Sequence, residues 1–121
     1  MISLTKLRKI LSLRMRTSGE DFDYLFYAAV NDVISDIIVE TVFDVDAIDE
    51  DDPGTEIDLA AKYFNVFLTG VSYFLSKSPA YSRQTDELND GEYRRALAKM
   101  QGEAMEDEET PVGQDYEIED E

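Results

Sequence analysis

The chain has no cysteine and no histidine among its 121 residues. Without cysteine, disulfides, zinc–thiolate sites and thiol nucleophiles are excluded. Without histidine, the chain lacks the commonest general base and the commonest ligand of transition metals. Any catalysis would have to use carboxylates, lysine, tyrosine or hydroxyls, and we expect no cofactor and no metal.

Long hydrophobic runs are also missing, which predicts no membrane-spanning helix and no membrane partner. A hydrophobic fraction of 43% is still enough for a packed core, and 121 residues fit one domain. Residues 1–16 are amphipathic, basic and free of acids, which is also typical of a mitochondrial presequence. We favour a helix that completes a bundle, and the presequence alternative stays open.

Basic residues are few, and they are separated from the acids along the chain. Residues 1–19 hold five bases and no acid, and residues 20–61 hold fourteen acids and no base. Residues 62–102 hold four acids and six bases, and residues 103–121 hold ten acids and no base. The net charge of −17 disfavours binding to a nucleic-acid backbone, because an acidic surface repels phosphate. The separation favours self-assembly or docking to a charged partner.

Apolar residues at helical spacing predict four helices, at residues 3–16, 21–43, 56–77 and 86–105. Capping boxes at Ser18–Asp21 and Thr55–Asp58 are expected to begin the second and third helices. Short connections favour antiparallel packing. The predicted fold class is all-α, an antiparallel bundle of about four helices in residues 1–102 with a flexible acidic C-terminal tail in residues 103–121.

One apolar face of each helix is expected to form the core. In the first helix this face consists of Leu4, Leu7, Leu11 and Met15. In the second helix it is a broader arc of Phe26, Val30, Val33, Ile34, Ile37 and Ile38. Gly70, in the middle of the third helix, costs about 1 kcal/mol relative to alanine. A close crossing with another helix would compensate for that cost.

Two acidic features raise the question of a metal site. Residues 44–56 do not satisfy the calcium-loop pattern, because a start at Asp44 puts Ile48 and Thr55 at ligand positions. Asp32, Asp36 and Glu40 share one stripe of the second helix, and such carboxylates could hold magnesium in a nucleotide pyrophosphatase. No matching ExxE…ExxD pair follows. We interpret the stripe as a water-facing or channel-facing acidic surface.

Candidate partner-binding residues occur at both ends of the chain. In the first helix they are Lys6, Arg8, Lys9, Arg14 and Arg16. An acidic protein patch, such as the second helix of a neighbouring copy, is the partner that fits them. Arg94, Arg95 and Lys99 form either a second contact or a solvated helix face. In the tail, Val112, Tyr116 and Ile118 indicate an extended docking arm, and a purely solubilising acidic tail is an equal alternative.

The order of these segments resembles a known family. A basic amphipathic first helix, a long second helix, an acidic turn and an aromatic third helix precede a last helix of the form EYRRALAKMQGEA. The strongest part of the match is DLAAKYFNVFLTGVSYFLSKSPAYSRQTDELNDGEYRRALAKM at residues 58–100. Over roughly residues 1–105 the chain resembles small helical head–tail connector (adaptor) proteins of tailed bacteriophages.

The resemblance implies a virion protein assembled in the host cytoplasm, as a homo-oligomeric ring, commonly dodecameric, beneath the portal. The ring would join the portal protein to tail or stopper proteins and line the DNA channel. DNA would pass without specific binding, since an acidic channel adds no affinity for phosphate. The stretch at residues 112–118 would be the arm that reaches into the portal.

Two other functions stay open beside this non-enzymatic one. An acidic inhibitor that imitates DNA to block a host defence enzyme would explain the net charge, although such mimics usually spread acids over the whole surface. A magnesium-dependent all-α nucleotide pyrophosphatase would use Asp32, Asp36 and Glu40. The DNA-mimic hypothesis predicts competition with DNA for a basic host protein. The pyrophosphatase hypothesis predicts loss of function when Asp36 is changed to Asn.

Overall fold

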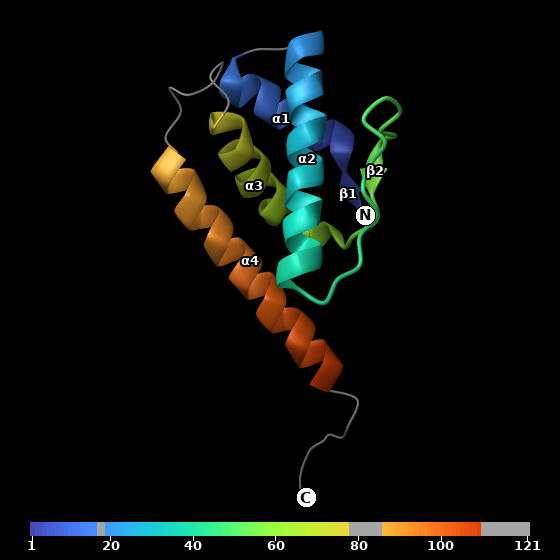
Figure 1. Cartoon of the computed structure of the whole chain (residues 1–121), viewed down its shortest axis with the longest axis vertical. Helices are drawn as coiled ribbons and strands as arrows, with labels where there is room; N and C mark the ends of the chain where they lie inside the picture. The colour runs from blue at the N-terminus through green and yellow to red at the C-terminus, as the bar shows by residue number, and fades with distance from the viewer. Residues whose placement is uncertain (17–18, 78–85, 110–121) are drawn as a thin grey trace, which may run out of the picture.

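The chain folds as the predicted all-α bundle, with a very short two-stranded sheet beside it (Figure 1). The computed structural model describes residues 1–16, 19–77 and 86–109. The elements in chain order are β1 (Ile2–Ser3), α1 (Leu4–Met15), α2 (Glu20–Glu40), β2 (Glu56–Ile57), the 3-10 helix η1 (Ala61–Tyr63), α3 (Phe64–Ser76) and α4 (Asp86–Glu109).

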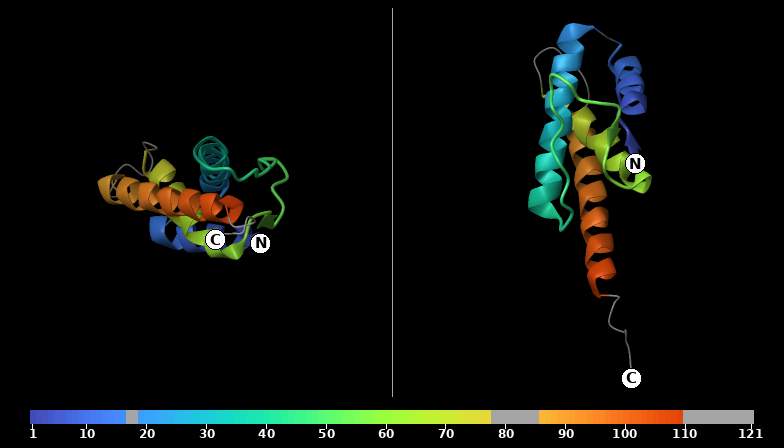
Figure 2. Two further views of the ribbon diagram at one scale, coloured as in Figure 1. Left: turned by 90° about the horizontal axis from the view of Figure 1, so that it is seen from below. Right: turned by 90° about the vertical axis from the view of Figure 1, so that its right-hand side faces the viewer.

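The helix α3 lies at the centre of the bundle and packs against α1, α2 and α4. Helices α2 and α4 run one way and α3 runs back between them, while the last turns of α4 extend beyond the bundle (Figure 2). A helix that is apolar on most sides is buried, as the sequence of α3 requires. The buried hydroxyls of Thr69 and Ser72 donate to the carbonyls of Asn65 and Leu68 in the same helix, so neither is left unsatisfied.

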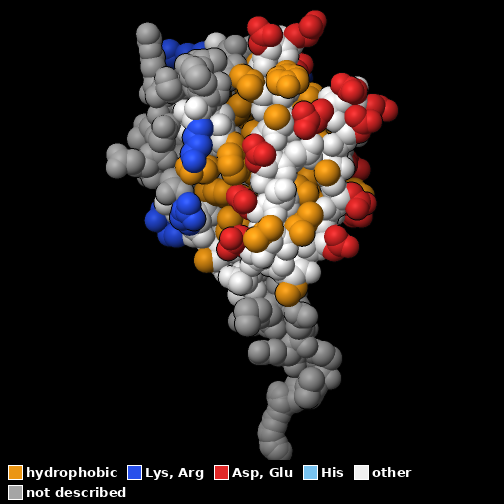
Figure 3. Space-filling view, viewed as in Figure 1, with side chains coloured by type: hydrophobic (Ala, Val, Ile, Leu, Met, Phe, Trp, Pro, Cys, Tyr) orange, Lys and Arg blue, Asp and Glu red, His pale blue; other side chains and the backbone are white. Residues whose placement is uncertain are grey.

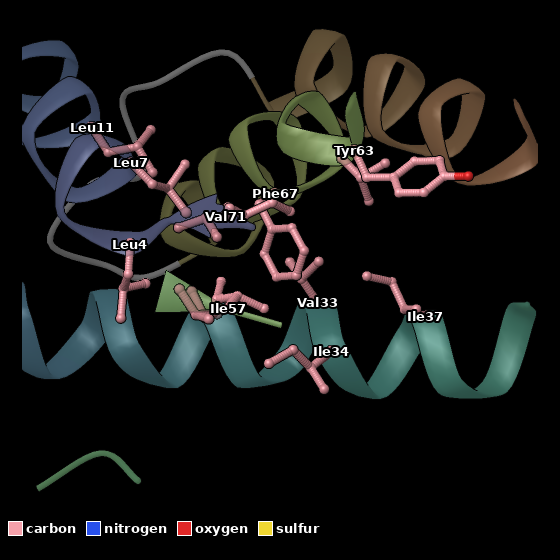
Figure 4. Close-up of a cluster of buried hydrophobic side chains, with 14 of the residues drawn as sticks. Leu4, Leu7, Leu11, Val33, Ile34, Ile37, Ile57, Tyr63, Phe67 and Val71 are labelled. Atoms are coloured by element: carbon pink, nitrogen blue, oxygen red, sulfur yellow. The ribbon is translucent and has the colours of Figure 1, made fainter. Parts of the chain in front are cut away.

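The core residues predicted for the first two helices are buried, with one exception. Val33 and Ile37 of α2 face the side chains of α1 and α3 across the core (Figure 4), and Ile34 is buried as well. Ile38 is 48% exposed, so its predicted burial is wrong. Phe22 is buried instead. The neighbours of α2 cover the side that carries Phe22 and Ile37, and Ile38 lies about 100° further around the helix.

The prediction that the third helix begins at residue 56 is wrong. Glu56 and Ile57 instead form β2, which pairs antiparallel with β1 in the register Ile2↔Ile57. The Leu4 N–H donates to the Thr55 carbonyl at 2.9 Å. The backbone at residues 55–57 therefore pairs with the N-terminal segment and does not form helical hydrogen bonds. The capping box expected at Thr55 is therefore not formed, and buried Ile57 is a strand residue.

The ends of α2 also differ from the prediction. Its N-cap is Gly19, whose φ of 107° is a conformation that suits glycine, and no side chain among the described residues caps the helix. Ser18, the predicted cap, lies outside the described residues. The helix ends at Glu40, because the Thr41 hydroxyl donates to the Ile37 carbonyl and accepts the Phe43 N–H. Phe43, three residues after the helix end, packs edge-on against Tyr63.

The close helix crossing predicted at Gly70 is confirmed. A Cβ at this position would lie 2.6 Å from Cε1 of Tyr93 and 2.7 Å from Cγ2 of Val33. Glycine therefore allows α3 to approach α2 and α4 at the same level. Its conformational cost is offset by this packing.

The last helix runs past residue 102, where the sequence placed the start of the tail. It ends at Glu109, and Glu103 forms an ion pair with Lys62, with 3.4 Å between Oε1 and Nζ. The rest of the predicted tail, residues 110–121, lies outside the described residues, and the candidate docking residues Val112, Tyr116 and Ile118 lie there.

Candidate interaction surfaces

The acidic stripe of α2 lies beside α4. Asp32 and Glu40 are exposed, whereas Asp36 is half-buried. The buried Tyr93 of α4 donates its hydroxyl hydrogen to Oδ2 of Asp36, with 2.7 Å between the oxygens. The middle of the stripe therefore joins two helices, a role that the spacing of the acids did not indicate.

A groove of about 360 Å³ opens next to this hydrogen bond, between α2, α3 and α4. We call it the α2–α4 groove. It is lined by Asp36, Glu40, Tyr73, Phe74, Tyr93, Arg94, Leu97, Ala98 and Gln101. The rings of Tyr73 and Tyr93 are stacked with centroids 5.9 Å apart, and Phe74 meets Tyr93 edge-on at the same distance. One wall is thus aromatic and another carries carboxylates.

The electrostatic field at this groove is negative. Burial is the main cause that raises the pKa of Tyr93 far above its usual range, and the hydrogen bond to Asp36 adds to it. The charges of Asp36, Asp32 and Glu40 raise the pKa of Tyr93 further, so all three carboxylates act on one hydroxyl. Partial desolvation by the neighbouring residues, then the nearby charges of Asp36 and Glu50, raise the pKa of Asp32.

Two of the five basic residues at positions 6–16 contact side chains of their own chain. The Arg8 guanidinium donates to both carboxylate oxygens of Asp23 on α2, at 2.8 and 3.2 Å. This hydrogen bonding is the main cause that raises the pKa of Arg8. The Lys6 ammonium lies 5.4 Å from the ring centroid of Phe64, a cation–π distance. These contacts lie within the chain, and the partner-binding role of Lys6 and Arg8 stays a prediction.

Arg14, near the end of α1, does lie with other bases. It shares a second groove of about 360 Å³ with Arg95 and Lys99 of α4. We call this the α1–α4 groove. Its lining is Arg14, Asn65, Leu68, Thr69, Glu92, Arg95, Ala96 and Lys99. Three bases and one carboxylate make it cationic. The fold therefore brings a base of α1 next to two bases of α4, which the sequence alone did not predict. Lys9 and Arg16 are also exposed, but neither lines this groove.

The two grooves lie on opposite faces of α4. The α2–α4 groove uses helix positions 93, 94, 97, 98 and 101, and the α1–α4 groove uses positions 92, 95, 96 and 99. At about 100° per residue, the centres of these two sets are about 180° apart. One side of α4 is therefore anionic and aromatic, and the other is cationic.

Apolar side chains are exposed near the anionic side. Ile38, Val39 and Val42 at the end of α2 are 48%, 77% and 56% exposed. Figure 3 shows apolar and acidic side chains interspersed on this face, with the visible bases gathered toward one edge and the top. Contiguous exposed apolar surface next to polar groups is typical of protein–protein contact sites.

The described residues contain no group of three or more carboxylates that could hold a metal ion. The magnesium hypothesis for Asp32, Asp36 and Glu40 therefore has no second acidic pair in the part of the chain that is described. In the same part, no helix combines the length and the apolar character needed to cross a bilayer.

Comparison of the chain with protein-family models, with curated proteins and with solved structures found no match. The features of the chain that bear on its function are the two grooves, the exposed apolar residues and the order of segments in the sequence.

Proposed function

We propose that the chain is a non-enzymatic structural adaptor of a phage virion. Identical copies form a ring beneath the portal, join it to tail components, and line the channel through which DNA passes. The observation that carries this proposal is the placement of an anionic and a cationic groove on opposite faces of α4. The resemblance of the helix order to head–tail connectors supplies the biological setting.

Complementary surfaces on two different sides of one subunit favour head-to-tail assembly. A contact of this kind repeats from copy to copy, and it produces a ring whenever the rotation between copies closes. The exposed Val39 and Val42 add apolar area to such a contact. A surface made only of acids would repel its own copies, so the cationic groove is necessary for self-assembly.

The acids outside the contact fit a wall that faces DNA. The loop between α2 and β2 carries exposed Asp44, Asp46 and Asp51 and contains no base. Such a surface releases no condensed counterions from DNA, and it therefore contributes no affinity for the backbone. DNA would move past it without being held.

The experiment is a mass measurement on the full chain, alone and mixed with the portal protein encoded by the same genome. Sedimentation and electron microscopy should show a closed ring of copies, alone or on the portal. A chain that stays monomeric and never joins the portal would contradict the proposal. Salt-sensitive competition with DNA for a basic host protein, without incorporation into virions, would establish the DNA-mimic alternative in its place.

A further inference from the structure

We infer that the α2–α4 groove is a receptor for a guanidinium or ammonium side chain, and that its occupant is a base from the α1–α4 groove of a second copy of this chain. The inference rests on the proposed function and deepens it, because it identifies the contact that would join neighbouring copies.

The acceptor groove combines the two features that recognise an organic cation. Its aromatic wall consists of Tyr73, Phe74 and the buried Tyr93, and aromatic rings attract cations through the ring quadrupole. Glu40 stands exposed at the same groove and can accept charge-assisted hydrogen bonds from the incoming group. Lys77 already places its ammonium 4.5 Å from the Tyr73 ring centroid, so this aromatic cluster accepts a cation within its own chain.

Carboxylates outnumber bases among the residues that line the acceptor groove. Among the described residues that line the groove, Arg94 is the one base, against the carboxylates of Asp36 and Glu40. Asp32 adds its charge from the preceding turn, and the pKa of Asp32 is raised partly by repulsion from Asp36. A second guanidinium would relieve this repulsion, which a neutral side chain of the same shape would not do.

The donor is found on the other side of α4. Arg95 and Lys99 are exposed and lie one turn apart, with Arg14 of α1 at the same groove. Planar guanidinium groups suit both partners available in the acceptor, since they stack on aromatic rings and bind carboxylates with two hydrogen bonds. Because donor and acceptor occupy opposite faces of one helix, each copy can use both at once.

The first experiment tests the acceptor directly with a small probe. Nα-acetylarginine amide is titrated into the full chain, and the ring NMR signals of Tyr73, Phe74 and Tyr93 are followed. We expect saturable shifts with this probe and none with the neutral isostere Nα-acetylcitrulline amide. Glu40→Gln should weaken binding about two- to fivefold, whereas the exposed loop variant Asp46→Asn should leave it unchanged. Equal responses to arginine and citrulline would overturn the inference.

The second experiment tests the occupant by charge reversal. Glu40→Arg destroys the acceptor and keeps the donor, and Arg95→Glu does the opposite. Each variant alone should sediment as a monomer under conditions where the unmodified chain associates. An equimolar mixture should associate, because each mixed pair keeps one unmodified donor and one unmodified acceptor. Circular dichroism checks that both exposed substitutions leave the helices folded.

Two outcomes of the second experiment would overturn the inference. One is an unmodified chain that stays monomeric even at millimolar concentration, and the other is charge-reversed variants that associate as well as the original. These failures differ from failure of the proposed function. Copies that join through the grooves but never bind a portal would contradict the adaptor role while supporting the inference.

Discussion

Tyr93 and Asp36, 57 residues apart in the sequence, are joined by a hydrogen bond of 2.7 Å between a phenol hydroxyl and a carboxylate. The bond ties α4 to α2 at the edge of the α2–α4 groove. Hydrogen bonds to an ionised acceptor are about twice as strong as those between neutral groups. The same tyrosine packs against Gly70 of α3, so one side chain sets the relative position of three helices.

We expect Tyr93→Phe to lower the free energy of unfolding by about 1–3 kcal/mol. The variant keeps the ring and its packing, and it removes the hydroxyl that donates to the half-buried carboxylate of Asp36. Urea unfolding followed by circular dichroism measures the change. Tyr24→Phe, at a tyrosine that is 69% exposed, should change stability by less than about 0.5 kcal/mol. Equal effects of the two variants would show that the hydrogen bond contributes nothing.

Gly70→Ala should destabilise the bundle by about 1–3 kcal/mol, since the new methyl group would overlap Tyr93 and Val33. Gly102 is the matched control within α4, because a Cβ there would meet nothing within 4 Å. Gly102→Ala should raise stability by up to about 1 kcal/mol, as alanine is the better helix former. Thermal unfolding of both variants distinguishes a packing effect from a propensity effect, and a Gly70→Ala variant as stable as the original would contradict the close crossing.

Asp32→Asn should stabilise the protein near pH 7 by less than about 1 kcal/mol. The pKa of Asp32 is raised in the folded chain by burial and by the charges of Asp36 and Glu50, so folding carries a penalty wherever Asp32 is ionised. The gain should shrink as the pH falls through this raised pKa, and vanish below the unfolded value near 3.8. Unfolding curves of both chains between neutral and acid pH measure it. A destabilised variant at neutral pH would refute the argument.

Asn31→Ala should loosen the acidic loop while leaving the helices intact. The Asn31 side chain accepts the Ile48 N–H at 2.8 Å, and it donates to the Ile48 carbonyl at 3.0 Å and to Glu50 at 3.1 Å. Loss of these bonds should cost about 1–3 kcal/mol. Hydrogen exchange of the Ile48 amide should accelerate far more than exchange in α3. Unchanged exchange at Ile48 would show that the loop is held by other contacts.

The bases of α1 should separate into two functional groups. Arg8→Gln removes the ion pair with Asp23 and should lower stability by about 1 kcal/mol or less without affecting self-association. Arg14→Gln, at a base of the α1–α4 groove, should weaken self-association and leave stability unchanged. Sedimentation and urea unfolding of both variants test this difference. If Arg8→Gln weakened association as much as Arg14→Gln, the donor surface would extend along the whole helix.

Local patterns were sufficient for most of the bundle. The spacing of Leu4, Leu7 and Leu11 predicted which face of α1 is buried, because helical periodicity alone selects it. The glycine inside α3 correctly predicted a close crossing. The same patterns failed at residue 56, because hydrogen bonds to the distant Leu4 segment, and not local propensity, decide the conformation there.

The helical fold and the segregation of charge could be predicted from the order and spacing of residues along the chain. Which charges lie next to one another depends on how the helices pack. Helix packing placed Arg14 beside Arg95 and Lys99, bound Arg8 to Asp23, and set the carboxylate of Asp36 against the aromatic wall. These residues are distant in sequence, and they become neighbours because α1, α2 and α4 all pack against α3. A local sequence pattern therefore could not predict their contacts.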